Sequence, residues 1–357
     1  MTAGTNMENV SQYNWRDMLS RSAVSVDQLE TRFNQDMGDL RTVVERYPMR
    51  INPYYLSLIK NPRDPMGLQA IPDIRELSTE LQSSDPLSEV PQSPVSCLIH
   101  RYPDRAVFLV SDTCAMYCRY CMRKRNITSA PELSGKKDRL EQGIRYIRNT
   151  PAIRDVILSG GDPLLLETET LSWILSRIRA IAHVDIIRIH TRIPCTLPAR
   201  ITEHLVSELK KHHPLYLNTH FNHPNEITPQ AAQACSSLAD AGIPLGCQTV
   251  LLKGVNDSPP VMAELMRKLI RIRVKPYYIH HPDPVAGTAH FRPPLETGFA
   301  VMRALRGHLS GLCVPQYMID LPGGKGKMPL LPPDIRCVSE KKITLLNYKG
   351  EICDYEF

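Results

Sequence analysis

Apolar residues recur at helical spacing in the first part of the chain. A stripe at three- and four-residue steps predicts an amphipathic helix over residues 26–47. It consists of Leu29, Phe33, Met37, Leu40 and Val44. Pro53 begins a shorter predicted helix that Asn61-Pro62 ends, and residues 85–94, rich in Pro, Ser and acidic residues, predict a linker.

Beyond residue 95 short apolar runs alternate with longer amphipathic segments. The expected strands are 106–110, 155–158, 185–190, 215–219, 244–251 and 276–279. The helical patterns between them lie near 137–149, 168–181, 202–212, 229–241 and 259–272. Repeated strand–helix units predict an α/β fold with a parallel sheet covered by helices. Six strands favour a partial (βα)6 barrel of the TIM type, with its chemistry at the carboxyl ends of the strands.

This pattern divides the chain into three expected parts. They are a helical N-terminal extension with its linker at 1–95, a barrel core at 96–290 and a C-terminal segment at 291–357. The 42% of hydrophobic and 22% of charged residues are typical of a soluble globular chain. Since the N-terminus carries no apolar leader and no apolar run reaches membrane-spanning length, we expect a cytoplasmic protein that does not bind membranes.

Charge and cysteine usage narrow the function further. The net charge of +6 is spread along the chain and only 6% of residues are aromatic, which argues against nucleic-acid binding. The ten cysteines are too scattered for the disulfide framework of a small secreted domain. We therefore expect chemistry on a small molecule.

One cysteine triplet stands apart, in the run C-A-M-Y-C-R-Y-C directly after the first expected strand of the barrel. Cys114, Cys118 and Cys121 have no fourth cysteine nearby, whereas a ferredoxin-like [4Fe–4S] site takes four thiolates. A cluster held by three would leave one iron open for a small molecule. Structural zinc, a disulfide pair and buried apolar thiols are the alternatives, and zinc would need a second ligand pair at finger-like spacing.

Two further motifs follow expected strands. Gly160, Gly161 and Asp162 lie in L-S-G-G-D-P, where the glycines permit a close approach of the backbone to a ligand. Gln248 lies near the end of a later strand. The alternatives are an ordinary tight turn for the glycines and a polar strand-end residue for Gln248.

A glycine-rich loop with two lysines occupies residues 320–329, D-L-P-G-G-K-G-K-M-P. It does not match a nucleotide-binding P-loop, because Met328 stands where the magnesium-binding Ser or Thr belongs. A lysine on such a loop can form a Schiff base with pyridoxal phosphate (PLP), which is one of several interpretations that the chemistry allows.

Long runs of the chain resemble the lysine 2,3-aminomutases, a family of radical S-adenosylmethionine (SAM) enzymes that carry PLP. The runs are N-P-Y-Y-L-S-L-I (52–59), H-R-Y-P-D-R (100–105), L-N-T-H-F-N-H-P-N-E-I-T (217–228), G-V-N-D (254–257) and R-G-H-L-S-G (306–311). The resemblance extends over nearly the whole chain from about residue 12.

The resemblance implies three cofactors and the residues that hold them. Cys114, Cys118 and Cys121 would bind a [4Fe–4S] cluster whose open iron chelates SAM. The motif Gly160-Gly161-Asp162 and Gln248 would contact SAM, and Lys327 would form the Schiff base with PLP. Arg101 and Arg105 would lie near the PLP phosphate, to which guanidinium groups are well suited.

The same resemblance implies the substrate. Arg123 matches the residue that pairs with the amino-acid carboxylate, and Asp283 and Asp320 match the pair that holds the distal ammonium of lysine. The implied reaction moves the 2-amino group of L-lysine to C3 and gives L-β-lysine. The implied partners are an electron donor such as flavodoxin or ferredoxin and, as a possibility, further copies of the chain.

The sequence departs from the family at several positions, and alternatives remain. His280-His281 precede Asp283, Lys325 adds a second lysine to the loop, and Ser258 replaces a zinc-binding cysteine, so we expect no zinc. The same chemistry on glutamate or arginine, or on lysine destined for elongation factor P, is the nearest alternative. A non-catalytic iron–sulfur protein is the alternative of a different class.

Overall fold

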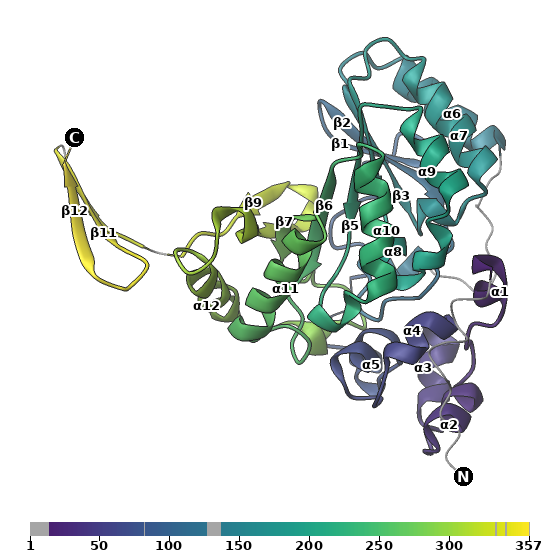
Figure 1. Ribbon diagram of the computed structural model, residues 1–357, viewed down its shortest axis with the longest axis horizontal. Coiled ribbons are helices and arrows are strands. Elements are labelled where there is room, and N and C mark those ends of the chain that lie inside the picture. The colour runs from purple at the N-terminus through teal and green to yellow at the C-terminus, as the bar shows by residue number, and fades with distance from the viewer. Residues whose placement is uncertain (1–13, 82, 127–136, 333, 340, 357) are drawn as a thin grey trace.

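The computed structural model describes residues 14–81, 83–126, 137–332, 334–339 and 341–356. At its centre is a nine-stranded sheet in the order β1-β2-β3-β4-β5-β6-β7-β8-β9, so the chain is α/β (Figure 1). The strands are β1 Leu98–Tyr102, β2 Arg105–Ser111, β3 Asp155–Gly160, β4 Ile186–His190, β5 Leu215–Thr219, β6 Leu245–Val250, β7 Lys275–His280, β8 Gln316–Asp320 and β9 Lys327–Pro329. Neighbours from β2 to β8 pair in parallel, and β1 and β9 add antiparallel edges.

The six expected strands correspond to β2 to β7, and each expected helix of the barrel region is present. Those helices are α6 Lys137–Arg148, α7 Thr168–Arg179, α9 Glu203–Lys210, α10 Pro229–Asp240 and α11 Pro259–Arg271, joined by α8 Ile193–Thr196 and α12 Leu295–Leu305. They pack along the sheet (Figure 1). Their buried faces carry the apolar positions of the pattern, such as Leu140, Ile144 and Ile147 on α6.

One parallel strand was not predicted. β8 lies beside β7 and carries the short run Tyr317, Met318 and Ile319. The sheet therefore continues beyond residue 290, where we expected the barrel core to end. This strand matters for the site because its last residue, Asp320, comes to lie at the edge where the other parallel strands end.

The N-terminal region is helical but more divided than expected. Its helices are α1 Trp15–Ser20, α2 Val26–Phe33, α3 Leu40–Arg46, α4 Pro53–Leu58 and α5 Pro65–Ala70. The expectation of one helix over residues 26–47 was wrong, because Asn34 adopts a left-handed φ of 50° and ends α2. The apolar period survives the break since Leu29 and Val43 are both buried.

The N-terminal helices are fastened to the loop that carries the cysteine triplet. The Asn52 side chain caps α4 by accepting from Tyr55 N, and its amide donates to the Ala115 and Thr196 carbonyls at 3.1 and 2.8 Å. Ile51 forms an antiparallel bridge with Met116. The extension therefore forms one wall of the site.

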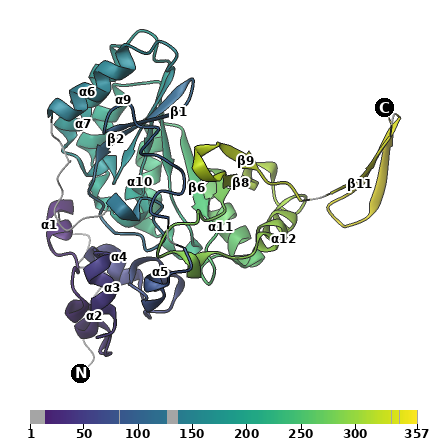
Figure 2. The ribbon, with the colours of Figure 1, turned by 180° about the vertical axis from the view of Figure 1, so that it is seen from behind.

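A second sheet contains only β10 Ile335–Val338, β11 Lys342–Leu346 and β12 Ile352–Glu356. It projects from the body beyond α12 in both views (Figures 1 and 2). Its strands leave Ile335, Val338, Ile352 and Tyr355 exposed. Among the described helices, none combines the length and the apolar character that crossing a membrane requires.

Candidate active site

The carboxyl ends of the parallel strands meet at one edge of the sheet, where most of the predicted residues gather. The cysteine loop follows β2, the Gly-Gly-Asp turn follows β3, and Asp320 ends β8. Asp283 lies just after β7. This arrangement follows from parallel pairing, which brings residues distant in sequence to the same edge.

Cys114, Cys118 and Cys121 are half-buried, and none of the ten cysteines, all of which are described, forms a disulfide. Arg192 Nη1 donates to Cys118 Sγ at 2.9 Å. Among the described residues no three His, Cys, Asp or Glu side chains are spaced to hold a single ion. An iron–sulfur cluster binds each thiolate to a different iron, so three sulfurs on one loop with a cation beside them suit a cluster.

A buried ionic cluster, Glu76-Arg119-Lys124, stabilises the cysteine loop, and it was not predicted from the sequence. Arg119 Nε and Nη2 donate to the Glu76 carboxylate at 2.9 and 2.6 Å, and Lys124 Nζ donates to it at 2.6 Å. Burial would raise the pKa of Glu76, but Arg119 and Lys124 hold it below its usual range. Since Arg119 and Lys124 flank Cys121 in the chain, one carboxylate fixes the backbone on both sides of that cysteine.

The Gly-Gly-Asp turn packs tightly on the backbone that leads into the cysteine loop. Gly160 has a φ of 118°, and a Cβ there would lie 2.1 Å from the Ser111 carbonyl oxygen. The close approach that the structure contains is thus to the protein's own chain. The Asp162 carboxylate is occupied as well, since Thr191 Oγ1 and Arg192 N donate to it at 2.6 and 2.7 Å.

Gln248 and Arg192 differ in the hydrogen bonds that their side chains form. Gln248 is half-buried on β6, where its backbone pairs with Tyr278 of β7, and its side chain has no hydrogen-bond partner among the described residues. Arg192 follows β4, and its Nη2 donates to Gln69 and Glu226 at 2.6 Å each. Nothing in the local sequence distinguished Arg192, because its partners come from three separate segments.

Lys327 is the loop lysine that reaches the interior. Its Nζ pairs with the Asp320 carboxylate, and its backbone N–H donates to Tyr102 Oη at 2.9 Å. Lys325 is exposed. A half-buried lysine paired with a carboxylate is placed for Schiff-base chemistry in a way that an exposed lysine is not.

Asp320 is buried but only partly satisfied. Its Oδ2 faces Lys327 and, at 3.6 Å, His280 Nδ1. Its Oδ1 has no hydrogen-bond partner in the described part of the chain, and Arg101 Nη1 is 3.9 Å away. Burial would raise the pKa of Asp320, but its contacts with His280 and Lys327 lower it to about 2, so the carboxylate is charged.

Asp283 is the second carboxylate at this place, and none of the described side chains or N–H groups donates a hydrogen bond to it. Burial, followed by the charge of Asp320, raises the pKa of Asp283 to about 7. Lys327 and Arg101 act in the opposite direction. The two carboxylates therefore act on each other, and among the described residues no cation forms an ion pair with Asp283, an arrangement that favours binding of a positively charged group.

Arg101 and Arg105 are placed differently. Arg101 Nε and Nη2 donate to Gln92 Oε1 and the Leu87 carbonyl at 2.7 and 3.0 Å, which leaves Nη1 directed toward Asp320. Arg105 pairs with Asp104 at 2.8 Å and stacks 3.9 Å from the centre of the Tyr102 ring. Tyr102, which also binds the Lys327 backbone, is therefore the link between Arg105 and the loop.

Arg123 reaches the same interior from the cysteine loop. Its Nε and Nη2 donate to Glu89, with distances down to 2.8 Å, and its Nη1 lies 3.4 Å from Ser159 Oγ. The charges of Arg123 and Lys327 both contribute to lowering the pKa of His190 to about 3, after burial and Arg188. The charges of both Arg123 and Lys327 therefore act on His190, which is half-buried on β4.

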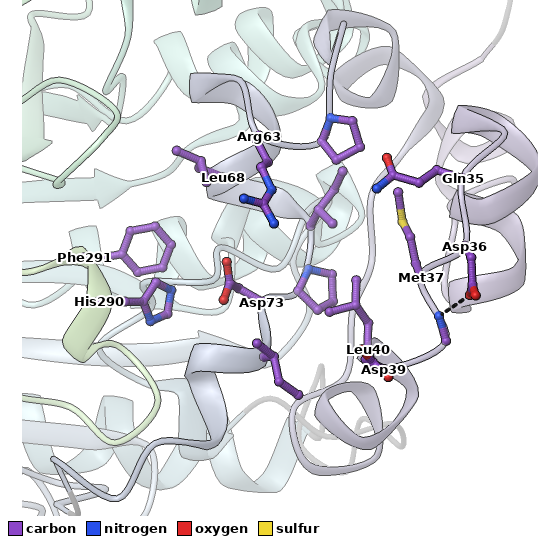
Figure 3. Close-up of a pocket in the computed structure, with 15 residues that line it drawn as sticks. Gln35, Asp36, Met37, Asp39, Leu40, Arg63, Leu68, Asp73, His290 and Phe291 are labelled. Atoms are coloured by element: carbon purple, nitrogen blue, oxygen red, sulfur yellow. Dashed lines mark hydrogen bonds between the residues drawn. The ribbon is translucent and has the colours of Figure 1, made fainter.

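A surface pocket of about 330 Å³ lies elsewhere, between the N-terminal helices and residues 289–291 (Figure 3). Asp73, Arg63 and Met37 face it from the N-terminal side and His290 and Phe291 from the other. The predicted site residues, all of which are described, are absent from its lining. We therefore assign the chemistry to the strand ends and none of it to this pocket.

Comparison with known proteins agrees with this geometry. Residues 108–266 match the radical SAM superfamily, and residues 302–357 match a family described as lysine-2,3-aminomutase. The chain is 48% identical to an L-lysine 2,3-aminomutase from Clostridium subterminale, over 96% of this chain and 83% of that protein. An L-lysine 2,3-aminomutase from Methanococcus maripaludis is 46% identical over 98% and 83%.

A glutamate 2,3-aminomutase from Clostridioides difficile is also similar, at 42% identity over 98% of this chain and 83% of that protein. Among solved structures, a radical SAM methyltransferase from Sphaerobacter thermophilus has a TM-score of 0.45 at 18% identity, covering 62% of this chain and 68% of that one. That structural likeness is too slight to add to the argument.

Proposed function

This chain belongs to the lysine 2,3-aminomutase family, and from that premise we propose that it moves the 2-amino group of L-lysine to C3, giving L-β-lysine. Chains of this family work with a [4Fe–4S] cluster, SAM and PLP. The enzyme is an isomerase, because the atoms of the substrate are rearranged without net gain or loss.

The observation that carries the choice of lysine is the pair of carboxylates Asp283 and Asp320, whose hydrogen-bonding capacity is only partly used. Among the described residues Asp320 Oδ1 has no hydrogen-bond partner, and burial beside Asp320 raises the pKa of Asp283 to about 7. The ε-ammonium of lysine would donate to both carboxylates and relieve their repulsion. The γ-carboxylate of glutamate would add a third negative charge instead.

The opposite end of the substrate would be bound by Arg123, whose guanidinium is a fixed cation with donors in a fork. An anchor at each end of lysine holds the carbon chain between them, and such positioning makes a large contribution to catalysis. Asp320 is buried and the Arg123 side chain is only 15% exposed, which would limit the access of water to the reacting carbons.

Cofactor placement is proposed on the same residues. Cys114, Cys118 and Cys121 would hold the cluster, while Gly160, Gly161, Asp162 and Gln248 would lie against SAM. Lys327 would hold PLP, with Arg101 and Arg105 on its phosphate side. When bound, the three groups together supply hydrogen abstraction from C3 and a carrier for the migrating nitrogen.

For Lys327, the pairing with Asp320 and the exposure of Lys325 support the assignment. Borohydride reduction of the loaded enzyme followed by peptide mapping is expected to find the pyridoxyl group on Lys327. A label on Lys325 would contradict it.

We propose the finer architecture and setting as well. Parallel strands from β2 onward would act as the partial (βα)6 barrel of the radical SAM class, with 1–95 as a helical extension, 96–290 as the core and 291–357 as the segment that carries the PLP lysine. An electron donor such as flavodoxin or ferredoxin would reduce the cluster, and copies of the enzyme would assemble as a homo-oligomer. The three free thiols of the cluster loop suit the reducing cytoplasm.

The function is tested by one anaerobic assay in which the reconstituted enzyme is offered L-lysine, L-glutamate and L-arginine in parallel. We expect β-lysine as the main product and little conversion of glutamate. Preferred conversion of glutamate or arginine would overturn the substrate, and conversion of none of the three, in protein with full iron and PLP content, would overturn the activity.

A further inference from the structure

The segment 85–94, which the sequence predicted as a linker, lies against the active site. Pro86 O accepts from Gly323 N of the lysine loop at 2.9 Å, and Leu87 O accepts from Arg101. Glu89, in the middle of the segment, is 6% exposed at its side chain and pairs with Arg123. Charged side chains on a simple linker are usually exposed, so the burial of Glu89 indicates that this segment has a further role.

Glu89 is itself held firmly. Its backbone N–H donates to Asp85 Oδ1 at 3.0 Å, and its carbonyl accepts from Ser93 Oγ at 2.8 Å. Its carboxylate also accepts from Arg125 Nη2 at 2.8 Å. Burial would raise the pKa of Glu89, but Arg123 and Arg125 hold it below its usual range. The side chain is therefore a charged and fixed reference point.

The bonds from Arg123 to Glu89 use one side of the guanidinium. Nε and Nη2 donate to the carboxylate, whereas within the described part of the chain Nη1 has only Ser159 Oγ as a hydrogen-bond partner, at 3.4 Å. A guanidinium carries five N–H donors in one plane, so the edge formed by Nη1 and Nη2 keeps donors for a second carboxylate. A second carboxylate bound at this edge must lie in the plane of the Arg123 guanidinium. The bonds to Glu89 set the orientation of that plane.

From this geometry we infer that Glu89 is a positioning residue for the α-carboxylate of the substrate: it orients Arg123 and so fixes which face of the α-carbon is presented. The inference rests on the proposed function for the identity of the amino acid and for the contact of Arg123 with its α-carboxylate. Glu89 does not attract the carboxylate, because its own charge is negative. Glu89 instead affects the orientation in which the substrate carboxylate binds, so a test must separate an effect of orientation from an effect of charge.

The enantiomers of lysine allow that separation, because L- and D-lysine carry identical charges. The test measures the dissociation constants of both enantiomers for the anaerobic holoenzyme by calorimetry, in wild type and in Glu89→Gln. We expect the ratio of the two constants to fall at least about tenfold in the variant, whatever happens to the affinity for L-lysine. An unchanged ratio would overturn the proposal.

Three further variants complete the design. Arg123→Lys removes the guanidinium itself and is expected to show the largest loss of discrimination between L- and D-lysine. Glu89→Asp, which keeps the charge but withdraws the carboxylate by one methylene, is expected to give a smaller loss and serves if Glu89→Gln does not fold. Asp185→Asn removes a carboxylate that binds Arg154 in the same two-bond fashion on the surface and is expected to leave the ratio unchanged.

The effect of the Glu89 variants can be measured separately from the identity of the substrate. If wild type binds an amino acid other than lysine, the same ratio is measured with the enantiomers of that amino acid. A retained ratio in both Glu89 variants then still counts against Glu89 alone, while the identity of the substrate is decided by the wild-type assay.

Discussion

The Glu76-Arg119-Lys124 cluster and the pair of Asp283 and Asp320 are balanced differently. In the Glu76-Arg119-Lys124 cluster one carboxylate has two cations, and the pKa of Glu76 is lowered despite burial. In the pair of Asp283 and Asp320 only Asp320 forms an ion pair with Lys327, and the pKa of Asp283 is raised to about 7.

The difference separates a structural cluster from a binding site. A buried charge whose partners are all present contributes to holding the loop, and removing one partner leaves the others uncompensated. A buried carboxylate that accepts no hydrogen bond from the protein can accept hydrogen bonds from a ligand instead. The four predictions below test this contrast.

The largest expected effect is on stability, in Glu76→Gln. The variant leaves Arg119 and Lys124 buried without their carboxylate, and breaking a buried ion pair costs about 3–5 kcal/mol. Urea unfolding of the wild type and the variant measures the loss, and reconstituted iron content shows whether the cysteine loop is affected. A loss below about 1 kcal/mol would mean that Glu76 does not hold the loop.

The next effect is on lysine turnover, in Asp283→Asn and Asp320→Asn. A hydrogen bond to a charged group contributes roughly 1.5–3 kcal/mol, so kcat/KM for lysine should fall at least about tenfold in each variant. Asp320→Asn should also discriminate less against glutamate. The comparison is made at matched PLP and iron content, and wild-type turnover in both variants would withdraw these residues from substrate recognition.

Asp283→Asn should at the same time stabilise the enzyme without substrate. The folded chain keeps a proton on Asp283 up to about pH 7, whereas the ordinary pKa of a free aspartate side chain is 3.8. The unfolded chain therefore binds fewer protons between these values, and the contribution of Asp283 to stability falls as the pH rises through that window.

The variant should be more stable than wild type by about 1 kcal/mol or more at pH 8, since one unit of pKa corresponds to about 1.36 kcal/mol. Its advantage should shrink toward pH 4. The groups that act on Asp283 are Asp320, Lys327, Glu89 and Arg101. Thermal unfolding of both proteins across this pH range measures the difference, and a constant difference would contradict the assignment to Asp283.

The smallest effect is expected at the surface, in Asp185→Asn. Arg154 and Asp185 form two hydrogen bonds of 2.8 and 2.9 Å, but both side chains are 56% exposed. Exposed ion pairs contribute about 0–1 kcal/mol. A loss as large as that of Glu76→Gln would show that burial and charge balance do not distinguish the two kinds of cluster.

Much of the fold could be predicted from the sequence because the barrel helices and strands have strong local patterns. The expected helix over residues 26–47 was wrong because a single left-handed residue, Asn34, ends α2 without disturbing the apolar period. The strand β8 was missed because its apolar run is too short to stand out. Glu89 was missed since its only local context is a segment rich in Pro, Ser and acidic residues.

The sequence by itself determined the spacing of the three cysteines, the alternation of strands and helices, and the family to which the chain belongs. These depend on residues close together in the chain or on the order of the letters. Only the tertiary structure decided that Glu76 balances Arg119 and Lys124, that Glu89 orients Arg123, and that one oxygen of Asp320 lacks a partner. Whether a buried charge is compensated depends on distances between segments far apart in sequence, and folding alone sets those distances.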